Sequence, residues 1–222
     1  MNQFMFLYPI PEYIQFEIKL GAFGWKCPTW EKKWIKRFQE LSESERDKLR
    51  PTAILEKETR FSYQYSKILN RCIDERYRKR GFNVNWVIFK EHPISNLINL
   101  HLDDSVIQTD IDFKTHTTKL PDGTYPYPNP DFIIKQLGNI DLLRISGFHM
   151  WDCVERVAKR AYEKGINVLV DEDLTELMSF RFREAYFRAD RYPTYNPRTL
   201  DKESFEQFMK PRRDCPWLYQ SY

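Results

Sequence analysis

The second half of the chain alternates between helix-like and strand-like segments that are joined by short connections. The hydrophobic pattern predicts a helix over residues 131–137, a strand over 140–145, a helix over 152–164, a strand over 166–170 and a helix from Asp173 to about Ala189. Pro130 and Gly165 stand where a helix begins and ends. Alternating helices and strands with short connections require right-handed crossovers and a parallel sheet. This half therefore predicts an α/β fold.

The first half adds strands to that sheet and a long aromatic segment. Buried strands are predicted over residues 4–8 and 83–89, and a helix over 59–80 that ends at Gly81. Residues 93–112 fit either a strand or a loop. We predict one three-layer αβα domain with a mainly parallel sheet over residues 1–222. It would carry an aromatic-rich N-terminal insertion at 11–60 and an irregular C-terminal arm at 190–222.

Charge and cysteine usage exclude several classes of protein. The 35 basic and 32 acidic residues nearly balance, and the dense basic runs at 76–80 and 210–213 are short, which argues against a nucleic-acid partner. None of the four cysteines forms a CxxC pair, which excludes a zinc ribbon. Neither a signal peptide nor a membrane-spanning stretch is visible, so we expect a protein of the reducing cytoplasm without a membrane partner.

Chemistry is expected in the turn after the strand at 140–145. In open parallel sheets ligands bind at the carboxyl ends of the strands, and Cys153 falls there, at the start of the next helix. The helix dipole favours a thiolate at that position, and backbone N–H groups there stabilise an oxyanion. The alternative is a small, inert, buried cysteine. From position alone the sequence leaves both readings open.

A set of spaced residues links this region to a known family. The run Leu137-Gly138-Asn139-Ile140-Asp141-Leu142-Leu143-Arg144-Ile145-Ser146-Gly147 is followed by Cys153-Val154, then by Ala161, Gly165 and the acids at 171–173. This pattern resembles the isochorismatase-like cysteine hydrolases, in which a strand ends in Gly and Cys-Val opens the next helix. The resemblance covers about 45 residues well, and more loosely the helix and strand between residues 60 and 90.

The resemblance implies an αβα fold and a set of catalytic roles. Cys153 matches the nucleophile, and Lys114 is the best candidate for the family's lysine, with Lys119 second. The family's aspartate would fall at residues 8–11, which contain no acid, and Glu12 is a poor substitute. Met150 stands where the family has Thr.

These roles predict a hydrolase that cleaves a C–N bond in a small amide through a thioester, with no cofactor or metal. Met150, Trp151 and His149 would shape the pocket of the small-molecule substrate. We expect a homo-oligomer, because the rings in the insertion suit a subunit contact. One alternative is a non-catalytic member of the fold that serves as a binding or assembly module. Another is a metal-dependent phosphoester hydrolase built on the following side chains: His101, Asp103, Asp104, Asp110, Asp112 and His116.

Overall fold

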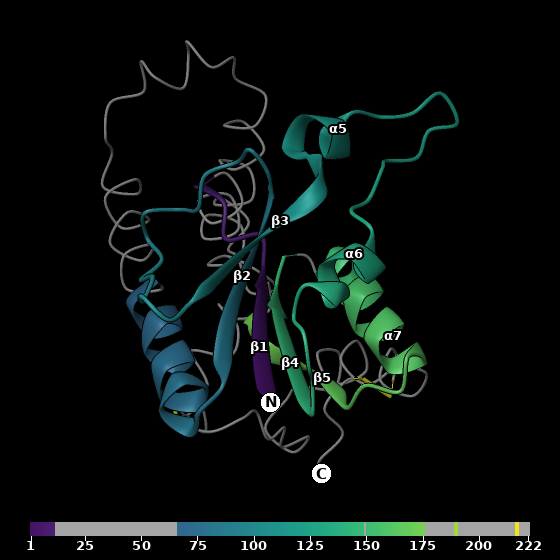
Figure 1. Cartoon of the computed structure of the whole chain (residues 1–222). Coiled ribbons are helices and arrows are strands. Elements are labelled where there is room, and N and C mark those ends of the chain that lie inside the picture. Colours follow the sequence, from purple (N-terminus) through teal and green to yellow (C-terminus); the bar gives the residue numbers. More distant parts are fainter. Residues whose placement is uncertain (12–65, 149, 176–188, 191–215, 218–222) are drawn as a thin grey trace, which may run out of the picture.

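Five parallel strands form the centre of the molecule (Figure 1). The computed structural model of the chain describes residues 1–11, 66–148, 150–175, 189–190 and 216–217. The strands are β1 Asn2–Leu7, β2 Asn83–Lys90, β3 Ser105–Asp112, β4 Leu142–Gly147 and β5 Val168–Thr175. They lie in the order β3-β2-β1-β4-β5, and every pairing is parallel. Along the chain, β2 and β3 are added on one side of β1, and β4 and β5 are added on its other side. The strand order therefore reverses between β1 and β4.

Helices cover both faces of the sheet, which gives the predicted three-layer α/β fold. One face carries α6 Pro130–Lys135 and α7 Glu155–Glu163, and the other carries a helix that covers residues 66–76 (Figure 1). Short helical turns complete the described part. They are η1 Arg78–Arg80, α5 Phe113–Thr117 and the π-helix η2 Met150–Val154.

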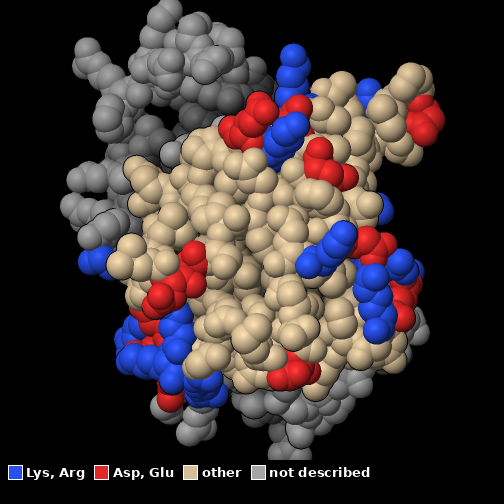
Figure 2. Space-filling model, viewed as in Figure 1, with Lys and Arg blue, Asp and Glu red and all other residues tan. Residues whose placement is uncertain are grey.

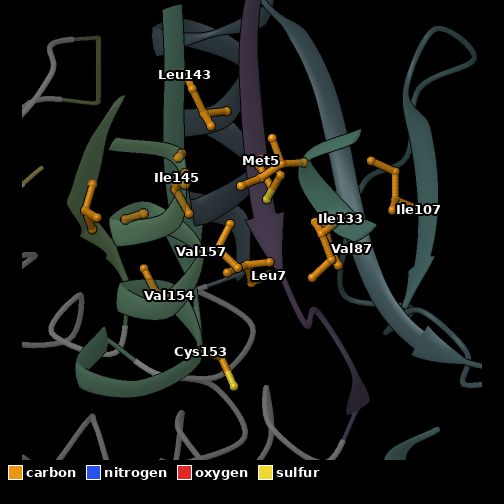
Figure 3. Close-up of a cluster of buried hydrophobic side chains, with 14 of the residues drawn as sticks. Met5, Leu7, Val87, Ile107, Ile133, Leu143, Ile145, Cys153, Val154 and Val157 are labelled. Atoms are coloured by element: carbon orange, nitrogen blue, oxygen red, sulfur yellow. The ribbon is translucent and has the colours of Figure 1, made fainter. Parts of the chain in front are cut away.

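Strand β1 supplies both layers of the core, because successive side chains of a strand point to opposite faces. Met5 and Leu7 pack with α6 and α7 in an aliphatic cluster (Figure 3), which also includes Ile145 of β4. Phe4 and Phe6 pack on the other face with residues of the helix at 66–76. All of these side chains are fully buried. A strand buried on both faces explains the continuous apolar run at residues 4–8.

Several elements lie where the pattern predicted them. The predicted strands at 4–8, 83–89 and 140–145 correspond to β1, β2 and β4. The helical residues 66–76 and the turn after them end at Gly81, whose φ of 75° lies in the left-handed region that favours glycine. The ambiguous segment at 93–112 supplies the edge strand β3.

The end of β5 corrects one prediction. A helix was expected to begin at Asp173, but that residue lies inside β5, which continues to Thr175. The pairing of β5 with β4 shifts register between Ile145 and Gly147, so β5 carries an irregularity at residues 171–174. Strand β5 is therefore longer than its hydrophobic run at 166–170 indicates.

The insertion and the arm fall almost entirely outside the described residues. Pro11 is the only described residue of the segment 11–60, so its predicted packing and its role in assembly stay predictions. In the described part of the arm, the carbonyl oxygen of Trp217 accepts the backbone N–H of Val170 at 2.9 Å, and the Trp217 ring, which belongs to the aliphatic core cluster, packs near Tyr162. No helix in the described ranges is long and apolar enough to cross a membrane.

Candidate functional site

The carboxyl ends of β1 and β4 touch each other, and a glycine makes this contact possible. Gly147 has a φ of 121°, and a Cβ atom there would lie 2.2 Å from the carbonyl oxygen of Leu7. Phe148 then donates its backbone N–H to the same oxygen at 3.1 Å. No other residue type fits, because the clash is with backbone that cannot move aside. Gly147 and Phe148 are thereby fixed against the end of β1.

The end of β1 holds a tight turn where the family resemblance places an acid. Tyr8 has a φ of 60°, which is strained for a residue with a side chain. Its carbonyl oxygen accepts the backbone N–H of Ile10 at 2.7 Å across Pro9. The ring of Tyr8 is buried and stacks on Phe89 at 4.4 Å between centroids. This turn therefore presents an aromatic ring and aliphatic groups, and no carboxylate, at the end of β1.

Cys153 lies in η2, two residues before Glu155, where α7 begins. Its side chain is 4% exposed and belongs to the aliphatic core cluster. Figure 3 shows its sulfur beyond the carboxyl end of β1, at the rim of that cluster. The sequence prediction of a cysteine at the start of this helix is confirmed. Single π-turns of this kind occur often at functional sites.

Three polar side chains lie beside Cys153, and we refer to them as the edge cluster: Tyr127, Asp152 and Arg156. Tyr127 donates its hydroxyl to Asp152 Oδ2 at 2.8 Å. Arg156 donates Nε–H to Asp152 Oδ1 at 3.1 Å, and its guanidinium carbon stands 3.8 Å from the centre of the Tyr127 ring. The edge cluster ties the loop before α6 to the first turn of α7.

The charges of the edge cluster act on one another. Partial burial and the hydrogen bond to Asp152 both raise the pKa of Tyr127. Burial opposes the charge on Arg156, but Asp152 outweighs it, so the pKa of Arg156 rises. A negative charge on Cys153 also contributes to raising both pKa values.

His116 packs against the aromatic rings next to the edge cluster. His116 stacks on Phe89 at 4.9 Å and meets the edge of Tyr127 at 5.2 Å, measured between ring centroids. Its Nδ1 lies 2.7 Å from the carbonyl oxygen of Pro126. Since a carbonyl only accepts, Nδ1 carries a proton, and this contact fixes how the ring is oriented. His116 thus helps to hold the Tyr127 ring in place.

The other predicted site residues stand apart or outside the description. Lys114 is exposed on α5, which follows the edge strand β3. Strands β3 and β4 are three positions apart, a span of about 14 Å at the usual spacing. His149 lies outside the described residues, and for Met150 and Trp151 only the backbone in η2 is described. Their predicted roles stay predictions.

Three of the carboxylates proposed as metal ligands, Asp104, Asp110 and Asp112, have other partners. Asp104 accepts from Arg78, from Trp86 Nε1 at 2.7 Å and from the backbone N–H of His101 at 3.1 Å. Burial opposes its charge, but these hydrogen bonds prevail and lower the pKa of Asp104. Asp110 accepts the N–H of Asn129, and Asp112 caps α5 by accepting from Thr115. Within the described ranges, no group of three or more metal-binding side chains comes together.

A second Asp–Arg–Tyr set, which we refer to as the buried cluster, lies on the opposite face of the sheet: Arg76, Tyr77 and Asp171. Arg76 Nη1 lies 3.1 Å from both carboxylate oxygens of Asp171, and Arg76 Nε donates to the carbonyl oxygen of Ala189 at 3.1 Å. Tyr77 donates its hydroxyl to Asp171 Oδ2 and stacks on Phe4. Asp171 thereby holds the helix at 66–76 on the sheet.

An open groove of about 760 Å³ lies along the outer side of that helix. Figure 2 shows basic and acidic side chains mixed at this corner, over the helix end at the lower left. Asp74 pairs with Arg78, and Glu75 pairs with Lys79. Two basic residues of the run at 76–80, Arg78 and Lys79, are therefore paired with acids at the helix end, whereas Arg76 is buried.

Sequence reasoning singled out Cys153 but missed the edge cluster. Asp152 and Arg156 are four residues apart in a predicted helix, a spacing that indicates an ion pair. Nothing in the loop before α6 indicated that Tyr127 would reach them. No protein-family profile, curated protein or solved structure matches this chain.

Proposed function

We propose that this chain is a divergent isochorismatase-like hydrolase that cleaves the C–N bond of a small amide. The position of Cys153 carries the proposal. Its thiol lies at the carboxyl ends of β1 and β4, where the strand order reverses, and this is where open α/β sheets bind ligands. Arg156 supplies a positive charge beside it.

The proposed reaction proceeds through a covalent intermediate. The Cys153 sulfur attacks the amide carbon, a C–S bond forms, and the C–N bond breaks as the amine leaves with the proton that the thiol has given up. Water then attacks the thioester, which releases a carboxylic acid and restores the thiol. In this scheme Lys114 orients or polarises the substrate, and the residues at 149–151 shape its pocket. The protein would work in the cytoplasm as a homo-oligomer.

A second candidate is a non-catalytic binding or assembly module on the same frame. The end of β1 favours it, because the turn at residues 8–10 supplies no carboxylate to take the thiol proton. Asp152, the carboxylate next to Cys153 in the chain, already accepts from Tyr127 and Arg156. The two candidates differ in whether an acyl group is transferred to Cys153.

Limited labelling with iodoacetamide, mapped by mass spectrometry, tests the reactivity of Cys153. Near neutral pH we expect Cys153 to alkylate faster than the other three cysteines. Cys72, which is fully buried in the opposite core, is the internal control. Labelling of Cys27 or Cys215 with Cys153 untouched in folded protein would contradict a reactive site.

Intact-mass spectrometry with a panel of small amides then separates the two candidates. A hydrolase forms an acyl adduct on Cys153 and releases the amine, and Cys153→Ser abolishes both. A thiol that alkylates readily but forms no adduct with any amide, and releases no amine, supports the binding module instead.

A further inference from the structure

Two arginines of α7 use their guanidinium groups in different ways. Arg160 contacts Asp131 through Nε at 3.0 Å and Nη2 at 2.8 Å, and Glu163 through Nη1 at 3.4 Å. Arg156 lies one turn earlier and makes one hydrogen bond, from Nε to Asp152. Both terminal nitrogens of Arg156 lack a partner among the described residues. An arginine has five donors, so most of its capacity remains available.

The side chain of Arg156 is nevertheless held in one place. Asp152 fixes Nε, and the ring of Tyr127 lies against the guanidinium plane with 3.8 Å between its centre and the guanidinium carbon. Tyr127 is itself tied to the other oxygen of Asp152. Asp152 holds the Nε side of the guanidinium and Tyr127 covers one of its faces. The two terminal nitrogens then form a preorganised pair of donors, a geometry that matches a carboxylate.

This outer edge is near the proposed nucleophile. Arg156 follows Cys153 by three residues where η2 continues into α7, and side chains three apart on a helix are neighbours. Tyr127 also packs on the core cluster that contains Cys153. The side chain of Arg156 is 53% exposed, so an incoming molecule can reach it.

We propose that Arg156 is a specificity residue that binds a carboxylate of the substrate while Cys153 attacks the amide carbon. This inference rests on the proposed function and narrows its substrate class to small amides that carry a negative charge. Tyr127 and Asp152 act as positioning residues for the guanidinium.

A pair of alkylating reagents tests the charge preference without knowledge of the substrate. Iodoacetate and iodoacetamide differ mainly in charge, so the ratio of their rates at Cys153 reports attraction of an anion. We expect Arg156→Gln to lower the ratio of iodoacetate to iodoacetamide by about threefold to fivefold, as for loss of a partly exposed ion pair. Added salt should lower the wild-type ratio towards that of the variant.

Arg160→Gln is the matched control, because it removes the same charge one turn away and should leave the ratio unchanged. An equal fall in both variants would indicate the general field of α7, and an unchanged ratio in Arg156→Gln would show that Arg156 attracts no anion. Either result overturns this inference alone and leaves the proposed function standing. If neither reagent labels Cys153, the proposed function fails, and this inference fails with it.

Discussion

The buried cluster and the edge cluster contain the same three residue types, Asp, Arg and Tyr, in different surroundings. Arg76 and Asp171 have side chains that are 1% and 0% exposed, whereas Arg156 and Asp152 are 53% and 36% exposed. In the buried cluster both carboxylate oxygens face one arginine, and Nε of that arginine donates to the carbonyl oxygen of Ala189. In the edge cluster the arginine keeps its two terminal nitrogens for solvent or a ligand.

The difference shows that burial, and not residue type, separates a structural role from a functional one. Charges removed from water must satisfy each other, so the buried cluster has one arrangement, and a change there costs folding energy. Charges near the surface exchange partners at little cost. The edge cluster is therefore the one able to respond to a ligand.

Removal of the arginine from each cluster should give the largest contrast. Arg76→Met leaves the Asp171 carboxylate buried without its cation, and we expect a loss of about 3–5 kcal/mol in the free energy of unfolding. Arg156→Met should cost at most about 1 kcal/mol. Urea unfolding followed by circular dichroism measures both. Equal losses in the two variants would show that the two clusters contribute equally to the stability of the fold.

Removal of the tyrosine hydroxyls should repeat the contrast on a smaller scale. Tyr77→Phe takes a donor from a buried carboxylate while the stacking on Phe4 remains, so we expect a loss of about 1.5–3 kcal/mol. In Tyr127→Phe, water can replace the hydroxyl at the half-exposed Asp152, and a loss of about 0.5 kcal/mol is expected. A larger loss for Tyr127→Phe than for Tyr77→Phe would reverse the assignment of the two clusters.

The smallest effect is expected in the titration of Tyr127. Burial and Asp152 raise its pKa above the usual 10.0, so folding favours the phenol. The stability that this provides is present below pH 10 and is lost as the pH rises through the pKa of the folded protein. Phenolate absorbance, taken as wild type minus Tyr127→Phe, measures this pKa. Asp152→Asn should lower it, and no change would mean that the hydroxyl does not contact Asp152 in solution.

The sheet was predictable because local pattern and tertiary role agree there. The apolar runs that became β1, β2 and β4 are buried on both faces, and glycines stand where helices end. Strand β5 was predicted too short, because the polar residues at 171–173 do not look like a buried strand. Asp171 is tolerated there only because Arg76 reaches it from 95 residues away, which no local pattern reveals.

Part of the candidate site was predictable because local sequence pattern and tertiary position agree there too. Cys153 follows a strand and opens a helix, and both signals are local. The sequence showed that residues 8–11 contain no acid. It did not show that Tyr8 stacks on Phe89, because that contact depends on the pairing of β1 with β2. Tyr127 reaches Asp152 across 25 residues from an irregular loop, so the edge cluster required the structure.

The central position of β1 has a consequence for how the chain folds. Gln3 and Asn85, which hydrogen-bond between β1 and β2, are 82 residues apart, and Met1 and Asp141, which pair beside β4, are 140 apart. On the ribosome the apolar segment of β1 is therefore made long before either strand that flanks it. Contacts this distant in sequence slow folding, and an apolar strand promotes aggregation until it pairs with its neighbours. We expect slow refolding, and a yield of native protein that depends on low temperature or on a chaperone that shields this strand.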